Sequence, residues 1–452
     1  MGAKVEGGPP ATATAPGGPL AGRYRSVVFD LDGVVYLGDQ AIPDAPETLE
    51  GVRGLGVRVG FVTNNALRPA SAVADKLNRL GVKASAEEVL TSADAVVRLL
   101  GGPEGLAGRR VLALGGPGLL EALEGAGARL LDPRDWRAAE LVVAGLDPAL
   151  TYDKVRAATL AIAAGARFVG SNADASLPTP EGPWPGAGSV LALLETATGV
   201  RPAVAGKPEP ALFEAAAARL GAAPILMVGD RDDTDLAGAK ALGWDVALVL
   251  SGVTRPERLL DLPAAPDHLL ADVGGLLAPP GPLIRSAGGA EAEAAMALLA
   301  TEGHGGHGGH GGHGGHGVPD VPAVLLVAVD QQDGRVVGAV ACRLPGGEGE
   351  DGAAGRGEAL LDGVVVAAER RGALIGTRLL LAASLTLRAR GPGRGRGAQA
   401  IVARRTSDTS AAGFLTRLGF HPATDGALVR ELRPAARPQA GSEAAVEGEP
   451  QA

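Results

Sequence analysis

The chain has 452 residues, enough for about three domains of ordinary size. Its apolar share of 46% can supply a sizeable core and excludes global disorder. The net charge of −9 and the isoelectric point near 5.4 argue against wholesale electrostatic binding to nucleic acid. We therefore expect a multidomain globular protein without a nucleic-acid partner.

Cysteine usage and hydropathy predict a location. Cys342 is the single cysteine, so no intramolecular disulfide can form, which fits a reducing cytoplasm. The first residues lack the apolar core of a secretory signal. No stretch reaches about 18 apolar residues free of charge, so we expect no membrane span. The predicted location is the cytoplasm.

Composition and periodicity divide the chain into five parts. Residues 1–22 are rich in Gly, Pro, Ala and Thr and predict a disordered tail. In residues 23–277, short apolar runs alternate with amphipathic helical stretches, which favours a parallel α/β architecture. Residues 278–320 are dominated by Gly, Pro and His and predict a linker. A second globular unit covers 321–434, and 435–452 predict another disordered tail.

The linker contains histidines at every third position. Gly and His at this density cannot build a core, so a spacer is the favoured interpretation. A metal-binding tract stays open as the alternative, because His-rich segments bind metals. The residues concerned are His304, His307, His310, His313 and His316.

Polar side chains follow several of the predicted strands between residues 23 and 277. Ligands of open α/β sheets bind at the carboxyl ends of the strands, so we expect these side chains to converge on one rim. The expected site residues are Asp30, Asp32, Gly33, Thr63, Asn64, Asn65, Lys207, Asp230 and Asp235.

Carboxylates of this kind suit phosphoryl transfer. Asp30 can act as a nucleophile that takes the phosphoryl group as an aspartyl phosphate. Asp32 can protonate the leaving alcohol and later deprotonate the attacking water. Two carboxylates one residue apart repel each other, so a cation is expected between them. Mg²⁺ prefers oxygen ligands, which Asp30, Asp230, Asp235 and the backbone carbonyl of Asp32 could supply.

The remaining residues of the set suit an anion. Thr63 and Lys207 could hold the charge of the transferring phosphoryl group, and Asn64 and Asn65 are predicted to bind phosphate or substrate. Gly33 would let the backbone approach the phosphate closely.

The ordered segments "DLDGVVYLG", "FVTNN", "GKPEP" and "GDRDDTD" resemble the four motifs of the haloacid dehalogenase superfamily of phosphatases. The residues within these segments are similar to those of the subgroup that includes p-nitrophenyl phosphatases and NagD. The resemblance implies a Rossmann-like core over 23–95 and 200–277. It also implies an inserted α/β cap over 96–199, which would close the site and select the leaving group. A homo-oligomer is left open.

The second unit resembles the acetyltransferases related to GCN5, an α+β fold, through "VVVAAERRGALIGTRLLLAA" and "AAGFLTRLGF". Backbone N–H groups at a helix N-terminus would cradle the pyrophosphate of acetyl-CoA there. Arg371 and Gly376 fit the family loop, but Leu374 replaces its first glycine. Phe414 and Leu415 stand where relatives often carry a tyrosine acid. We therefore expect a degenerate, non-catalytic domain, in which acetyl-CoA binding is not favoured.

The fused layout resembles that of mycobacterial glycerol 3-phosphate phosphatase. The layout alone suggests glycerol 3-phosphate as the substrate, a small phosphorylated metabolite of glycerophospholipid turnover. Two alternatives stay open. One is a phosphatase for 2-phosphoglycolate, a nucleoside monophosphate or pyridoxal phosphate. The other is a bifunctional phosphatase and acetyltransferase.

Overall fold

The computed structural model divides the chain into two compact units. The first unit extends to Arg255 and includes Pro266–Pro282 and Asp330–Gly334, and the second unit contains the other residues. The structure describes residues 17–179, 181–221, 223–302, 324–344, 358–389, 398–403, 409–423 and 427–432. The five linker histidines and the expected C-terminal tail lie outside these ranges. No helix among the described residues is long and apolar enough to cross a membrane.

The first unit is built on a six-stranded parallel sheet in the order β15-β14-β13-β1-β4-β5. All residues of the central strands β1 and β13 are buried, as their continuous apolar sequences predict. The strands are β1 (Ser26–Phe29), β4 (Arg58–Thr63), β5 (Val89–Thr91), β13 (Ile225–Gly229), β14 (Asp245–Val249) and β15 (His268–Leu270).

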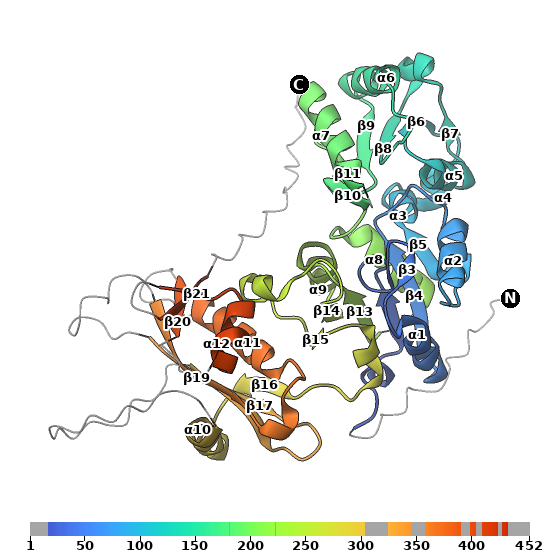
Figure 1. The fold of residues 1–452 in the computed structure, drawn as a ribbon. Helices are drawn as coiled ribbons and strands as arrows, with labels where there is room; N and C mark the ends of the chain where they lie inside the picture. The colour runs from blue at the N-terminus through green and yellow to red at the C-terminus, as the bar shows by residue number, and fades with distance from the viewer. Residues whose placement is uncertain are drawn as a thin grey trace, which may run out of the picture. The chain divides into compact units, whose positions relative to one another are not determined.

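Helices cover both faces of this sheet (Figure 1). Side chains alternate along β1, so Val27 and Phe29 join one core cluster and Val28 joins the other. The flanking elements are α1 (Ala45–Gly54), α2 (Ala70–Arg79), α3 (Ser92–Leu99), α4 (Gly102–Leu106), α8 (Pro210–Leu220) and α9 (Ala237–Ala241), with a small hairpin β2 (Tyr36–Leu37) and β3 (Gln40–Ala41) after β1. This arrangement is the Rossmann-like core that the sequence predicted.

A second, five-stranded parallel sheet forms the inserted cap, in the order β12-β9-β8-β6-β7. Its elements are β6 (Arg110–Leu114), α5 (Pro117–Gly125), β7 (Arg129–Leu130), β8 (Leu141–Ala144), α6 (Tyr152–Ala163), β9 (Arg167–Gly170), the hairpin β10 (Ser176–Thr179) and β11 (Gly182–Pro185), α7 (Ala187–Thr198) and β12 (Ala203–Val204). The pairing of β12 with β9 carries the cap sheet beyond residue 199, where the sequence placed its end. Strand β12 has only two residues, which is too short for an alternating apolar pattern to be recognised in the sequence.

Two segments expected to be unstructured are ordered. Leu20–Arg23 forms a 3₁₀ turn that begins inside the predicted tail, and Leu20 is buried in the core of the first unit. Inside the predicted linker, β16 (Leu283–Ser286) pairs with β17, and α10 (Ala290–Glu302) buries Ala295 against the sheet of the second unit. The linker expectation is therefore wrong for these residues, because a four-residue strand and an Ala-rich helix carry weak periodicity.

The second unit contains a seven-stranded mixed sheet in the order β16-β17-β18-β19-β20-β22-β21. Its remaining elements are β17 (Val324–Val329), β18 (Val336–Arg343), β19 (Glu358–Val366), α11 (Ile375–Ala389), β20 (Ala400–Ala403), α12 (Thr409–Arg417), β21 (His421–Pro422) and β22 (Leu428–Glu431). β19 and β20 run parallel and the other neighbouring strands run antiparallel. This sheet and helix α11 match the α+β fold expected for the unit.

Leu374 precedes helix α11 and has a φ of 56°. This left-handed conformation favours glycine, and it is uncommon for a leucine. The loop thus keeps the backbone shape of a glycine position although the glycine itself is replaced.

Candidate active site

Three buried carboxylates meet at the carboxyl edge of the core sheet. Asp30 follows β1 and Asp230 follows β13, and these two strands are neighbours in the sheet. Asp235 lies in a π-helical turn, Asp232–Leu236, that follows Asp230. One carboxylate oxygen from each of Asp30, Asp230 and Asp235 lies within 4.8 Å of the others. Such a cluster is costly unless cations balance it.

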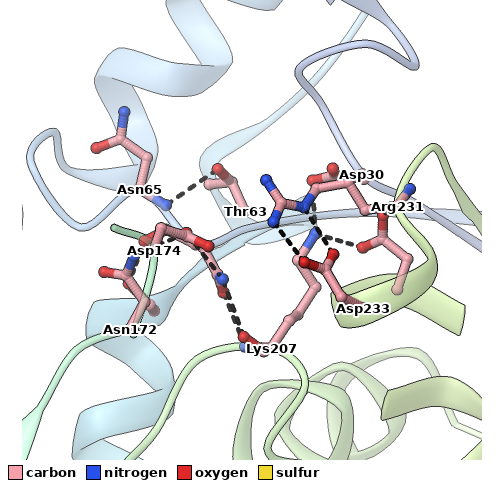
Figure 2. A network of polar contacts seen from close by, with 11 residues as sticks. Asp30, Thr63, Asn65, Asn172, Asp174, Lys207, Arg231 and Asp233 are labelled. Atoms are coloured by element: carbon pink, nitrogen blue, oxygen red, sulfur yellow. Dashed lines mark hydrogen bonds and ion pairs between the residues drawn. The ribbon is translucent and has the colours of Figure 1, made fainter. Parts of the chain in front are cut away.

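Lys207 supplies one of these cations. Its Nζ lies 2.7 Å from Oδ1 of Asp30 and 2.7 Å from Oδ1 of Asp235. Figure 2 shows the lysine side chain reaching up from its loop toward Asp30. Burial lowers the pKa of Lys207, but the charges of Asp235 and Asp30 outweigh burial and raise it above its ordinary value. The ammonium group therefore stays protonated between the two carboxylates.

Asp230 has one satisfied and one unsatisfied oxygen. Its Oδ2 accepts a hydrogen bond of 2.6 Å from the backbone N–H of Val253. Its Oδ1 is buried without a hydrogen-bond partner among the described residues. Burial raises the pKa of Asp230 to about 6, and the nearby charge of Asp235 adds to the shift. Burial also raises the pKa of Asp30, and Lys207 opposes that shift.

These residues fit a Mg²⁺ ion. The ion prefers carboxylate oxygens. The buried Oδ1 of Asp230, which has no hydrogen-bond partner in the part of the chain that the structure describes, is an acceptor that a cation would satisfy. Asp30 and Asp230 would hold the ion. Asp235 already binds Lys207 through Oδ1, and its Oδ2 accepts the N–H of Arg231 at 3.2 Å. The role that the sequence predicted for Asp235, as a metal ligand, therefore competes with its pairing to the lysine.

Asp32 lies outside this buried cluster. Its side chain is exposed, whereas Asp30 is buried. Surrounding protein nevertheless desolvates the carboxyl and raises the pKa of Asp32, with Lys76 opposing the shift. Lys76 lies on α2 with its Nζ 3.7 Å from the ring centroid of Tyr36, a residue in a β-bridge with Asp32. Asp32 thus has the access to solvent that a proton-transferring group needs.

The backbone at Gly33 passes close to Asp230. Its N–H donates to the carbonyl of Tyr36 at 2.8 Å, and its carbonyl accepts from Oγ of Ser251 at 2.7 Å. A Cβ atom at this position would lie 2.5 Å from Oδ2 of Asp230 and 2.9 Å from the Cα of Gly252. Gly33 also has a φ of 82°, which strains any other residue.

The variant Gly33→Ala is expected to weaken Mg²⁺ binding and turnover, because it must displace Asp230. We expect a loss of about 10- to 100-fold in metal affinity, as for a disturbed ligand environment. Gly38→Ala is the matched control, because Gly38 has a φ of 56° and nothing within 4 Å of an added Cβ. Both variants are compared by calorimetric Mg²⁺ titration. Equal losses in the two variants would contradict the clash at Asp230.

Thr63, at the end of β4, and Asn64 and Asn65, which follow it, make different kinds of hydrogen bond. Oγ1 of Thr63 accepts the N–H of Asn65 at 3.2 Å and keeps its hydroxyl proton for a ligand. The side chain of Asn65 is exposed and its Oδ1 accepts the N–H of Leu67 at 2.8 Å, so it shapes the turn. The Asn64 side chain is hydrogen-bonded to Lys207 and to Asp174 of the cap. Its partners in the structure are therefore protein groups.

The sequence reasoning missed the loop after β14. Ser251 binds the carbonyl of Gly33, Gly252 allows close packing against Asp230, and Val253 donates its N–H to Asp230. The rule that ligand sites lie at the carboxyl ends of parallel strands applied here as well, since "LSGV" follows β14, "DVALV". The segment was overlooked because backbone donors leave no mark in the residue types.

The chain matches family models at both of its units. A haloacid dehalogenase-like hydrolase model matches residues 27–129, and a second model of that kind matches 204–276. An acetyltransferase (GNAT) domain model matches 322–422. An acid sugar phosphatase from Staphylococcus saprophyticus is 34% identical over 256 residues, which is 56% of this chain and 97% of that protein. The chain belongs to the haloacid dehalogenase-like hydrolases.

Some relatives are similar to more of this chain than its first unit. D-glycerol 3-phosphate phosphatase from Mycobacterium tuberculosis is 43% identical over 234 residues, 52% of this chain and 65% of that protein. Crystal structures of glycerol phosphate phosphatase from the same organism, in complex with magnesium and with calcium, are similar at a TM-score of 0.64. These structures have 30% identity and cover 88% of this chain and 98% of theirs. The chain is thus a phosphoric monoester hydrolase of this family. Its buried carboxylates fit the magnesium with which one of these relatives was crystallised.

Mg²⁺ is expected to raise the thermal stability of the protein most strongly above pH 6. In the metal-free protein, the raised pKa of Asp230 means that the folded state binds more protons than the unfolded chain between pH 3.8 and about 6. The free energy of unfolding contributed by this group therefore falls as pH rises through that window. Mg²⁺ would reverse the loss by binding the ionised carboxylates, with about 2.7 kcal/mol at a hundredfold excess over Kd.

Melting temperatures with Mg²⁺ and with a chelator, recorded from pH 5 to 8, measure this effect. The expected difference is largest at pH 8 and becomes smaller toward pH 5. A difference that does not change with pH would contradict metal binding by carboxylates of raised pKa.

Proposed function

We propose that this chain is a Mg²⁺-dependent phosphatase that hydrolyses a small phosphate monoester, with glycerol 3-phosphate as its substrate. One observation carries the proposal: the buried Asp30 carboxylate is paired with Lys207, beside an Asp230 oxygen that no other described residue contacts by a hydrogen bond. A nucleophile, a fixed cation and an open acceptor for a metal are thereby combined in one buried cluster.

Each residue of the site has a role in the proposed reaction. Asp30 attacks phosphorus and carries the phosphoryl group as an aspartyl phosphate. Asp32 protonates the leaving oxygen and then takes a proton from the attacking water. Lys207 and the hydroxyl of Thr63 stabilise negative charge on the transferring group. Bound Mg²⁺ supplies charge neutralisation at the phosphoryl oxygens.

Glycerol 3-phosphate is favoured by the relatives that share both units with this chain. The glycerol phosphate phosphatase structures from Mycobacterium tuberculosis cover 88% of the chain. The other candidates are 2-phosphoglycolate, a nucleoside monophosphate and pyridoxal phosphate. Acetyl transfer is not favoured, since Leu374 occupies the position of a loop glycine. We propose the cytoplasm as the compartment in which such a metabolite is met.

The test is phosphate release with Mg²⁺ from five esters at equal concentration. These are glycerol 3-phosphate, 2-phosphoglycolate, a nucleoside monophosphate, pyridoxal phosphate and p-nitrophenyl phosphate. The highest kcat/KM is expected for glycerol 3-phosphate. A higher value for another ester would overturn the substrate, and no release from any of them would overturn the phosphatase itself. Acetyl-CoA titration of the same protein is expected to show no binding.

A further inference from the structure

The side-chain amide of Asn64 holds the backbone of Lys207 at both of its polar groups. Its Oδ1 accepts the N–H of Lys207 at 2.8 Å, and its Nδ2 donates to the carbonyl of Lys207 at 3.0 Å. Both backbone groups of this lysine bond to Asn64 alone among the described residues. The close approach needs Gly206, since a Cβ there would lie 2.6 Å from Oδ1 of Asn64.

The same amide also reaches the cap. Its Nδ2 donates to Oδ2 of Asp174 at 3.1 Å, and Asp174 lies in the segment after cap strand β9. Oδ2 of Asp174 accepts a second hydrogen bond, from Nδ2 of Asn172 at 2.8 Å. Asn172 in turn accepts from Oγ of the buried Ser171 at 2.8 Å. Figure 2 shows Asn172 and Asp174 side by side, on the other side of the Lys207 backbone from Asp233.

A chain of hydrogen bonds thus runs from the cap to the nucleophile. It passes from the Asp174 carboxylate to the Asn64 amide, then to the Lys207 backbone and through its ammonium group to Asp30. A lysine side chain has many rotamers, so a fixed backbone is needed to place its Nζ within hydrogen-bond reach of two carboxylates.

We propose that Asn64 is a positioning residue, which sets Lys207 against Asp30 and couples this placement to the cap through Asp174. The inference rests on the proposed function, because Lys207 is the group that would stabilise the transferring phosphoryl charge. It replaces the expectation that Asn64 itself binds phosphate. A movement of the cap that alters the Asp174 contact would then change the position of Lys207.

Asn64→Ser removes the clamp, and Asn78 offers a matched control. Oδ1 of Asn78 accepts the N–H of Ala84 at 3.2 Å, and its Nδ2 donates to the carbonyl of Ala84 at 2.8 Å. Asn78→Ser therefore removes the same kind of backbone clamp at a place outside the carboxylate cluster. The variants are compared in the full chain by kcat and KM for p-nitrophenyl phosphate, by melting temperature, and by calorimetric titration of orthovanadate with Mg²⁺.

Asn64→Ser is expected to lower kcat and orthovanadate affinity by about 10- to 100-fold. This is the range found when a residue that orients a metal ligand by hydrogen bonding is removed, and Asn64 orients Lys207 in the same way. Asn78→Ser should lower only the melting temperature. Asp174→Ala should lower kcat in the same direction, and the double variant with Asn64→Ser should be no worse than Asn64→Ser alone. Asp174→Asn keeps an oxygen acceptor for the amide and should retain most of the activity.

Three results would overturn the proposal. They are equal effects of Asn64→Ser and Asn78→Ser on kcat and orthovanadate affinity, additive losses in the double variant, or an Asp174→Asn variant as impaired as Asp174→Ala. The orthovanadate titration does not depend on turnover. A wild-type chain that hydrolyses no ester would therefore defeat the proposed function, whereas the titration would still decide the role of Asn64.

Discussion

The Asp30→Asn variant is expected to lose phosphatase activity by about 10⁴-fold or more, the scale seen when a catalytic nucleophile is removed. The amide has nearly the shape of the carboxylate but cannot form an acyl phosphate. Asp235 still balances the charge of Lys207 in this variant, since Nζ of Lys207 lies 2.7 Å from Asp235 as well as 2.7 Å from Asp30 in the wild type. The fold should therefore persist, with a melting temperature close to that of the wild type.

Asp39→Asn is the matched control for Asp30→Asn. The Asp39 side chain is fully exposed and lies 3.8 Å from Lys76, so its removal should leave kcat within about twofold. The two variants are compared by phosphate release at saturating Mg²⁺. An Asp30→Asn variant with kcat near that of Asp39→Asn would remove Asp30 from the mechanism.

Lys207→Met is expected to reduce both stability and turnover. The change leaves the buried carboxylates of Asp30 and Asp235 without their cation. Breaking a buried ion pair on one side costs about 3–5 kcal/mol of unfolding free energy. Loss of a fixed positive group at the transferring phosphoryl group should lower kcat by about 10²- to 10³-fold. Urea unfolding without metal and steady-state kinetics with Mg²⁺ measure the two effects.

Lys83→Met is the control for Lys207→Met, because Lys83 pairs with Glu50 at 2.7 Å on the surface. Exposed pairs of this kind contribute little to stability. Lys207→Arg keeps the charge but not the shape of the ammonium group, and should restore stability more than kcat. A Lys207→Met variant as stable and active as Lys83→Met would contradict the role given to the buried lysine.

Much of the site could be predicted from strand ends. Asp30 and Asp230 each follow an apolar run, and parallel strands place such residues on one edge of the sheet. Lys207 is joined to them through the salt bridge to Asp30 that the structure shows. The residue types thus indicated the chemistry, because carboxylates and one lysine suit phosphoryl transfer wherever they converge.

The contacts made by amides and by the backbone could not be predicted. An asparagine next to a phosphate-binding loop suggests a ligand contact, yet Asn64 binds the Lys207 backbone and the cap. This choice depends on where residues far apart in sequence meet, which composition and spacing do not determine. The same holds for Val253, whose backbone N–H orients Asp230 and whose side chain gives no hint of that role.

Element prediction failed where sequence signals were weak or misleading. Glycine and proline around β16 indicated a linker, but four residues sufficed to pair with β17. The alanine-rich α10 lacks a clear apolar stripe, although it buries Ala295 in the second unit. In both cases tertiary packing outweighed local sequence preference.

The central claim is that Asp30 carries the phosphoryl group. A single-turnover reaction tests it most directly, with Mg²⁺ and glycerol 3-phosphate that carries the radiolabel in its phosphate group. The reaction is quenched in acid on the millisecond scale. Transient label is expected on the peptide that contains Asp30, and none in the Asp30→Asn variant. Free phosphate formed without any protein-bound label, or label on a peptide without Asp30, would contradict it.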